Sequence, residues 1–274
     1  MIESARNQKV RDVRRLAQKA ERTERAEFVL EGPQAVREAL MARPDLVVEF
    51  FATPTAYERH RDVAALAEDA GLEVLFASEE AVDAMSDTRN PQGIVAVAKQ
   101  FPTALKRIFD GEPKLVAILE EVRDPGNLGT IIRVADAAGA DAVVLTGRSV
   151  DLYNSKVVRS TTGSIFHIPI AVEAEFEDAV VRARNAGLRV VAADVRGDDL
   201  FEARQSGTLV EPTAWVFGNE ARGLTPELVA QCDASLAIPI YGQAESMNLA
   251  AAASVCLYES AFAQRAAQSI DQDA

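Results

Sequence analysis

Residues 115–139 read LVAILEEVRDPGNLGTIIRVADAAG, and this stretch decides the fold class. The apolar run Leu115–Leu119 predicts a short buried strand. The turn that follows, rich in Asp, Pro, Gly and Asn, leads into a helix expected at Gly129–Ala138. The same unit of apolar strand, polar turn and helix recurs as far as Ala263. Such alternation is typical of an α/β domain whose mostly parallel sheet is covered by helices on both faces.

The elements of this domain can be placed from their patterns. Strands are expected at Leu115–Leu119, Ala142–Leu145, Ile168–Ile170, Arg189–Ala193, Ala214–Phe217 and Ser235–Ile238. Helices are expected near Gly129–Ala138, Asn154–Ser160, Phe176–Ala186, Pro226–Ala230 and Ser246–Ala263. Residues 101–114 contain two prolines and a glycine without a clear pattern, so they predict a linker in front of the domain.

The first hundred residues alternate in the same way over shorter segments and predict a small α/β domain of their own. Its strands are expected at Phe28–Leu30, Leu46–Phe51, Glu73–Phe76 and Gly93–Ala98, and its longest helix at Thr55–Ala70. Residues 4–25 are expected to form one basic helix with an apolar face and a wet arginine face. The predicted organisation is therefore a domain at 1–100, a linker at 101–114 and a second domain at 115–274.

The charge of the chain is unfavourable for broad contact with nucleic acid. The formal net charge is −13, and phosphate contacts need Lys and Arg. The charge is uneven, however, because residues 1–26 carry eight basic and four acidic side chains. Such a leading segment can bind RNA locally, although a solvated surface helix explains the same pattern equally well.

Cysteines and histidines give no sign of a metal site. Cys232, Cys256, His60 and His167 show neither C-x-x-C nor H-x-x-x-H spacing, so we expect no metal and no disulfide framework. The first residues lack the apolar run of a signal peptide, and no apolar stretch is long enough to span a bilayer. We therefore expect no membrane partner and a reducing, cytoplasmic location.

The turn at Asp124–Gly129 follows a predicted parallel strand, and such sheets bind ligands at the carboxyl ends of their strands. Arg133 follows four residues after Gly129, so its guanidinium can point back toward a phosphate or a polar nucleophile. A dinucleotide-binding loop is the alternative, but G-x-G-x-x-G spacing is absent and no acidic residue ends the strand near Thr146. A plain strand–helix turn explains the glycines, but it does not require Asn127 and Arg133 together.

Two later segments have the same character. One apolar strand ends in Gly218-Asn219-Glu220, where glycine permits close approach of a ligand. The segment Ile238–Ala253 runs from a strand through a proline-containing loop and past Ser246, a candidate N-cap, into an Ala-rich helix. Alone, each segment is explained by a tight turn or a capped helix. Together, in this order and at strand ends, the three segments are specific.

The three segments resemble the three motifs of the SpoU (TrmH-type) RNA ribose methyltransferases of the SPOUT superfamily. That family shows Asn-x-Gly followed by Arg-x-Ala, then Gly-Asn-Glu-x-x-Gly-Leu, then Ile-Pro-x-x-Gly leading to Ser-x-Asn. Each pattern is present here, within residues 115–262. The leading part is similar to the family's L30e-like substrate-binding domain, through residues 28–32 and 90–94.

The resemblance implies a C-terminal SPOUT domain with a trefoil-knotted parallel sheet, which forms a homodimer. It implies 2′-O-methylation of a ribose in RNA with S-adenosyl-L-methionine as cofactor and without a metal. The small leading domain favours large-subunit ribosomal RNA (rRNA) as substrate; a transfer RNA (tRNA) guanosine methyltransferase and a non-catalytic RNA-binding protein of this fold are the alternatives. The implied cofactor-binding residues are Thr146, Gly147, Gly218, Ile238, Ile240, Met247 and Leu249.

The implied catalytic residues are Arg133, Asn127, Glu220, Ser246 and Asn248. The family counterpart of Arg133 is its essential arginine and is sometimes assigned as a general base. A guanidinium has a pKa above about 12, so we expect Arg133 instead to orient an RNA phosphate and stabilise the developing alkoxide. The two asparagines are expected to position the ribose and Glu220 to orient Arg133, while Ser246 is either catalytic or a helix cap.

Overall fold

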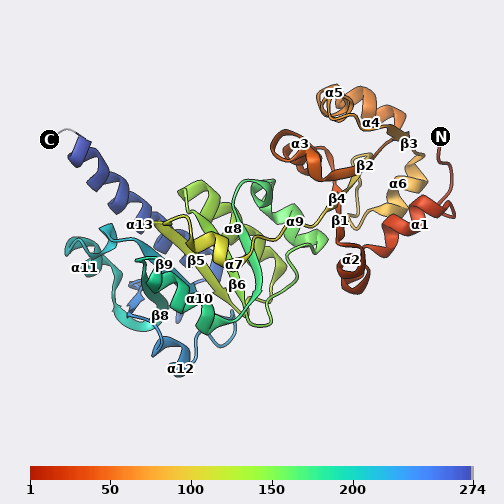
Figure 1. Ribbon diagram of the computed structural model, residues 1–274. Coiled ribbons are helices and arrows are strands. Elements are labelled where there is room, and N and C mark those ends of the chain that lie inside the picture. Colours follow the sequence, from red (N-terminus) through yellow and green to blue (C-terminus); the bar gives the residue numbers. More distant parts are fainter. Residues whose placement is uncertain (273–274) are drawn as a thin grey trace. The chain divides into compact units, whose positions relative to one another are not determined.

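The computed structural model describes residues 1–272, and the chain divides into two compact units (Figure 1). Unit 1 comprises Met1–Phe101 together with Asp151–His167. Unit 2 comprises Pro102–Val150 and the chain from Ile168 onward. Residues 151–167 were expected in the C-terminal domain, but they cluster with unit 1.

Unit 1 is built on a four-stranded mixed sheet. The strand order is β1 (Glu27–Glu31), β4 (Ile94–Lys99), β2 (Val47–Ala52) and β3 (Val74–Phe76). β4 is antiparallel to both neighbours, and β2 and β3 are parallel. The helices are α1 (Gln8–Arg15), α2 (Lys19–Arg25), α3 (Pro33–Ala42), α4 (Pro54–Arg59), α5 (Arg61–Asp69), α6 (Glu79–Met85) and α9 (Ser155–Thr161).

The single basic helix expected at residues 4–25 is wrong, because the chain breaks between α1 and α2. Arg22 explains the break: its Nη1 donates to the carbonyls of Leu16 (2.7 Å) and Ala17 (2.8 Å), just past the end of α1. Its Nη2 lies 2.6 Å from Asp151 Oδ2, and the residue is only 4% exposed. Arg22 is therefore a core residue. The helix expected at Thr55–Ala70 is likewise divided at His60.

Residues 151–167 complete the core of unit 1 with aromatic and ionic contacts. The Tyr153 ring lies 4.7 Å from that of Phe28, and its hydroxyl accepts a hydrogen bond from the Phe101 backbone N–H at 2.8 Å. The Phe101 ring stacks on Phe166 at 5.5 Å. Arg159 on α9 binds Glu31 at 3.1 Å. Residues 151–167 thus contact both β1 and Phe101, which follows the end of β4.

Unit 2 is built on a six-stranded sheet in which every neighbouring pair is parallel. The strand order is β10 (Ala234–Ala237), β8 (Arg189–Asp199), β9 (Thr213–Phe217), β5 (Leu115–Glu120), β6 (Ala142–Thr146) and β7 (Ile170–Ala174). The helices are α7 (Leu105–Phe109), α8 (Pro125–Ala138), α10 (Phe176–Asn185), α11 (Leu200–Gln205), α12 (Pro226–Val229) and α13 (Leu249–Gln272). The expected α/β class with a parallel sheet is confirmed.

Helices cover both faces of this sheet. On one face, Phe176 of α10 and Ile108 of α7 belong to a buried cluster with Ile118, Val144 and Val216 of the strands. Toward α13, the indole N–H of Trp215 on β9 donates to Ser260 Oγ at 2.9 Å, and α13 also packs against α8. The strands are therefore buried on both sides, which explains their nearly continuous apolar sequences.

Several boundaries differ from the sequence-based expectation: α8 begins at Pro125 rather than Gly129, and β7 spans Ile170–Ala174 rather than Ile168–Ile170. The expected linker 101–114 contains α7, whose Ile108 and Phe109 are buried in the core of unit 2. The final helix begins at Leu249 rather than Ser246. β8 extends to Asp199 rather than ending at Ala193, because β10 pairs first with Val191–Ala192 and then, after a register shift, with Asp198–Asp199. Residues 193–197 therefore leave the ladder between two paired segments.

The position of the reversal in strand order marks where a ligand is expected. From β5 the chain moves outward through β6 to β7, whereas from β9 it moves to β10 at the opposite edge of the sheet. The crevice at the carboxyl ends of β5 and β9 is thus a topological switch point, the usual ligand site of such sheets. None of the helices within residues 1–272 is long and apolar enough to cross a membrane.

Candidate functional site

The loops after β5 and β9 meet at the switch point through Glu220. Its carboxylate accepts hydrogen bonds from the backbone N–H groups of Asp124 (2.9 Å) and Arg123 (3.1 Å) and from Asn127 Nδ2 (3.3 Å). Partial burial opposes ionisation, but these hydrogen bonds outweigh it and hold the pKa of Glu220 below its ordinary value. Glu220 therefore binds the N-terminal turn of α8 as a carboxylate.

Asn127 links this loop pair to the third segment. Its Oδ1 accepts from Asn248 Nδ2 at 3.0 Å, while its own Nδ2 donates to Glu220. Asn248 Oδ1 in turn accepts from the backbone N–H groups of Ala250 (2.9 Å) and Ala251 (3.2 Å) at the start of α13. Asn248, not Ser246, is therefore the residue that caps this helix. Glu220, Asn127 and Asn248 form one hydrogen-bonded chain across the three segments.

Gly218 was expected to let a ligand approach the backbone closely, but in the structure it is the backbone of the same loop that approaches it. A Cβ at Gly218 would lie 2.5–2.7 Å from backbone atoms of Gly223 and Leu224, so the loop folds tightly onto itself. Asn219 holds the same loop, since its Nδ2 donates to the Glu121 carbonyl at 2.9 Å. Gly218 thus serves loop closure first, and that closure shapes one wall of the adjoining cavity.

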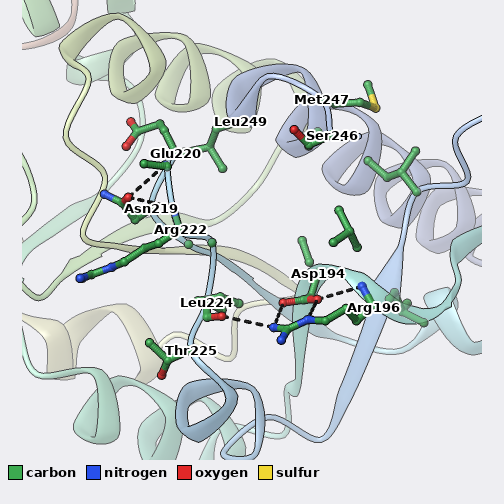
Figure 2. Close-up of a pocket in the computed structure, with 18 of the residues that line it drawn as sticks. Asp194, Arg196, Asn219, Glu220, Arg222, Leu224, Thr225, Ser246, Met247 and Leu249 are labelled. Carbon is green, nitrogen blue, oxygen red and sulfur yellow. Dashed lines mark hydrogen bonds and ion pairs between the residues drawn. The ribbon is translucent and has the colours of Figure 1, made fainter. Parts of the chain in front are cut away.

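A cavity of about 530 Å³ opens beside this network (Figure 2). Four segments form its walls: residues 193–196, which lie in the unpaired middle of β8, the loop after β9, the segment after β10 and the start of α13. Of the sequence-predicted residues, those that line it are Gly218, Glu220, Ile238, Ile240, Ser246, Met247 and Leu249. Asn127 and Asn248 do not line it, but Asn127 donates to Glu220, which does, and Asn248 donates to Asn127.

Thr146 and Gly147 are not among the residues that line this cavity, although the resemblance placed them near the cofactor. Thr146 is buried, and its hydroxyl donates to Glu120 Oε2 at 2.5 Å. Gly147 has a left-handed backbone with φ of 58°, and a Cβ there would lie 2.8 Å from both the Glu120 Oε1 and the Glu121 Cγ atoms. Thr146 and Gly147 therefore contact the side chains of Glu120 and Glu121 at the end of β5. They lie at the end of β6, which is on the side of β5 away from β9.

Arg133 stands on the exposed side of α8, about 9 Å along the helix axis from Asn127. Within residues 1–272 its side chain takes part in no hydrogen bond or ion pair, and it does not line the cavity of its own chain. The expected orientation of Arg133 by Glu220 is therefore wrong. The oxygens of Glu220 are occupied by the N-terminal turn of α8 instead.

The wall formed by residues 193–196 was not predicted from the sequence. Arg196 donates through Nε and Nη2 to the two carboxylate oxygens of Asp194, at 2.8 and 2.7 Å, and reaches the Leu224 carbonyl at 3.4 Å across the cavity (Figure 2). This ion pair lowers the pKa of Asp194, with the guanidinium hydrogen bond as the main cause. The available signal was Gly197, whose missing Cβ lets this segment lie against the backbone of Ser235 and Leu236.

The cavity has the features of a nucleoside-sized site. Its volume lies within the roughly 300–1,000 Å³ of small-molecule pockets. Leu224, Leu236 and Leu249 supply apolar wall, and Asp194 and Ser246 supply polar groups. Within the part of the chain that the structure describes, no group of three or more His, Cys, Asp or Glu side chains is arranged to hold a metal ion.

Comparison with known proteins agrees with this fold and site. Residues 114–258 match the SpoU rRNA Methylase family, and residues 29–104 match the RNA 2'-O ribose methyltransferase substrate binding family. The chain belongs to the SpoU rRNA methylase family. It is 38% identical, over 94% of its length and 97% of the relative's, to the 23S rRNA (guanosine(2553)-2'-O)-methyltransferase RlmP of Bacillus subtilis.

Solved structures are similar over nearly the whole chain. The AdoMet-bound rRNA methyltransferase from Sinorhizobium meliloti has a TM-score of 0.80 and 35% identity, covering 94% of this chain and 96% of that one. The SpoU methyltransferase AviRb from Streptomyces viridochromogenes, in complex with the cofactor AdoMet, has a TM-score of 0.80 and 28% identity, covering 95% and 99%. Both units are therefore shared with enzymes of this family.

Proposed function

We propose that this protein transfers the methyl group of S-adenosyl-L-methionine to a ribose 2′-hydroxyl of large-subunit rRNA. The observation that carries this proposal is the hydrogen-bonded chain Glu220–Asn127–Asn248, which joins the three family motifs at the edge of a nucleoside-sized cavity. Two relatives named as 23S rRNA 2'-O-methyltransferases support the substrate class: RlmP of B. subtilis, and the uridine(2479) enzyme of S. viridochromogenes, which is 38% identical over 62% of this chain.

The cofactor is proposed to lie in the 530 Å³ cavity. The apolar side chains of Leu224 and Leu249 would cover the adenine, and the backbone at Gly218 and Ile238 would line its edge. When bound, S-adenosyl-L-methionine supplies an electrophilic methyl group, so the task of the protein is to hold the attacking oxygen in line with it. The other proposed lining residues are Ile240 and Met247, while Thr146 and Gly147 act only at a distance.

We assign Asn127, Glu220 and Asn248 to positioning rather than to proton transfer. The side-chain amides of both asparagines are already engaged with each other, with Glu220 and with the start of α13. They fix the N-terminal turn of α8 against the cavity loop. Ser246 lines the cavity and is left to contact the substrate or cofactor.

Arg133 is proposed to bind the phosphate beside the target ribose and to stabilise the alkoxide that develops on its oxygen. A guanidinium suits this role because it stays charged and offers paired donors to a phosphate. Its exposure on α8, away from the cavity of its own chain, supports a further proposal: a homodimer through unit 2, in which a second copy completes the site.

A trefoil knot in unit 2 is also proposed. The chain passes from β10, at one edge of the sheet, through residues 238–248 back to α13, which packs against α8, β9 and β5. This return and the similarity to the solved family structures support it. A cytoplasmic location follows from the proposed substrate.

The decisive experiment maps 2′-O-methylated nucleotides in rRNA and tRNA with and without the gene. One lost site in 23S rRNA, restored by the purified protein with S-adenosyl-L-methionine, is expected. A lost site in tRNA would favour the tRNA guanosine methyltransferase, and no lost site would favour a non-catalytic RNA-binding protein. Titration calorimetry with S-adenosyl-L-methionine and with NAD provides the matching test of the cavity.

A further inference from the structure

We propose that Arg123 and Arg222 form a docking site for one phosphate of the RNA backbone, and that Glu121 occupies this site until RNA binds. The inference rests on the proposed RNA substrate and adds residues that grip it. All three residues belong to unit 2, in the loops that follow β5 and β9.

The two arginines converge on a single carboxylate from different loops. Arg123 Nη2 lies 3.4 Å from Glu121 Oε1, and Arg222 Nη2 donates to Glu121 Oε2. Arg222 also belongs to the residues that line the cavity, and in Figure 2 its guanidinium extends away from the other labelled side chains. Because guanidinium forks match carboxylate and phosphate oxygens in the same way, a site shaped around Glu121 also fits a phosphate.

The positive groups lie outermost in this cluster. The side chains of Arg123 and Arg222 are 53% and 60% exposed, whereas that of Glu121 is 17% exposed. The neighbouring carboxylates already have partners: Glu220 accepts from the turn of α8, and Asp124 accepts from the Asn127 N–H at 2.8 Å. A polyanion approaching this edge therefore meets the two guanidiniums before it meets any free carboxylate of this cluster.

The backbone of Glu121 is held in a conformation that side chains rarely adopt. Its φ is 51°, and it is fixed by Asn219 Nδ2, which donates to its carbonyl at 2.9 Å, and by its own N–H, which donates to the Thr146 carbonyl at 3.2 Å. Gly147 leaves the space for the Glu121 side chain. Left-handed non-glycine residues persist where their surroundings hold them and cluster at functional sites.

The charge of the whole molecule makes such a local device useful. At a net charge of −13, long-range forces repel RNA, so binding depends on short-range contacts at chosen phosphates. With Glu121 between them, the arginines keep their arrangement in the free protein. When a phosphate takes the place of the carboxylate, the pair is already in position, which reduces the ordering required on binding.

The test compares Arg123→Ala, Arg222→Ala, Glu121→Gln and the wild type in binding to an unmodified transcript of the protein's own large-subunit rRNA, at several salt concentrations. Each arginine variant should bind RNA about 3- to 10-fold more weakly and reduce the slope of log K against log salt by roughly 0.7–0.9. Glu121→Gln should bind several-fold more tightly, because the competing carboxylate is neutral. Arg182→Ala, which removes a surface ion pair with Asp178 on α10, is the matched control.

Wild-type affinity and wild-type salt slope in both arginine variants would overturn the inference. So would weaker RNA binding by Glu121→Gln, because Glu121 would then support RNA binding rather than compete with it. These outcomes are separate from failure of the proposed function, which would show as no methylation of rRNA by the wild-type protein. Calorimetry of Arg123→Ala with S-adenosyl-L-methionine checks that the cofactor cavity is intact.

Discussion

The loops that follow β5 and β6 start from neighbouring strands of one sheet, yet one belongs to the candidate site and the other to the core of unit 1. The loop after β5 turns back over the switch point and joins Glu220 and Asn248 through Asn127. The chain after β6 leaves unit 2 at Val150 and completes the core of unit 1 with residues 151–167. A place at the carboxyl edge of a parallel sheet is thus not enough to make a site; the switch in strand order decides it.

The largest expected effect is on the packing of residues 151–167 in the core of unit 1. Tyr153→Ala should destabilise unit 1 by about 3–5 kcal/mol, because a buried aromatic ring packed on Phe28 is lost. Hydrogen exchange should show lost protection in β1 and β4 while binding of S-adenosyl-L-methionine by unit 2 persists. Phe201→Ala, at a side chain that is 55% exposed, is the control. A cost below 1 kcal/mol would mean that residues 151–167 are not part of the core of unit 1.

The second effect tests the functional side. Arg133→Lys should lower kcat/KM about 100-fold, because the charge is kept while the guanidinium fork is lost. Cofactor affinity, measured by calorimetry, should stay unchanged since Arg133 does not line the cavity of its own chain. Full activity of the lysine variant would remove Arg133 from the mechanism.

A smaller effect is expected at Glu220. Glu220→Gln should lower kcat about tenfold, because the carboxylate that holds the turn of α8 becomes a neutral amide. The stability difference should be under about 1 kcal/mol, given solvent screening. Since the pKa of Glu220 is lowered in the folded state, this difference should be constant above about pH 5 and shrink as pH falls below 4.5. Denaturant titrations between pH 3 and 7 measure it, and a difference that grows in acid would contradict the assignment.

A substitution at Gly147 separates the ends of β5 and β6. Gly147→Ala should cost about 1–2 kcal/mol, from its left-handed backbone and the crowding of Glu121. Affinity for S-adenosyl-L-methionine should remain within twofold of the wild type. Gly71→Ala is the control, because Gly71 has a similar φ of 74° but open space around it. A tenfold loss of cofactor affinity would instead mean that Gly147 contributes to cofactor binding.

Much of the fold could be predicted because its strands and turns have recognisable patterns of neighbouring residues. The strands of unit 2 are short apolar runs buried on both faces, and the turns at Asn127, Gly218 and Asn248 follow strands or precede a helix. Their shared edge follows from parallel pairing alone. The family resemblance then supplied the assignment of residues, and the structure brings Asn127, Glu220 and Asn248 into one network.

What could not be predicted depends on partners far away in the sequence. Arg22 looks like a surface arginine until Asp151, 129 residues later, is placed beside it. The departure of residues 193–197 from the β8–β10 ladder is a register shift, which alternation of apolar residues does not reveal. Glu220 was predicted to orient Arg133, but its carboxylate is bound by the backbone N–H groups of Arg123 and Asp124, just before α8.

The membership of residues 151–167 in unit 1 also sets an order for synthesis. Unit 1 cannot acquire its full core when residue 101 leaves the ribosome, because roughly 66 more residues must follow before Phe166 and His167 are available. At 5–20 residues/s that delay is about 3–13 s. During that interval β5, α8 and β6 are already made, so the N-terminal unit finishes folding only after the first strands of the other unit exist.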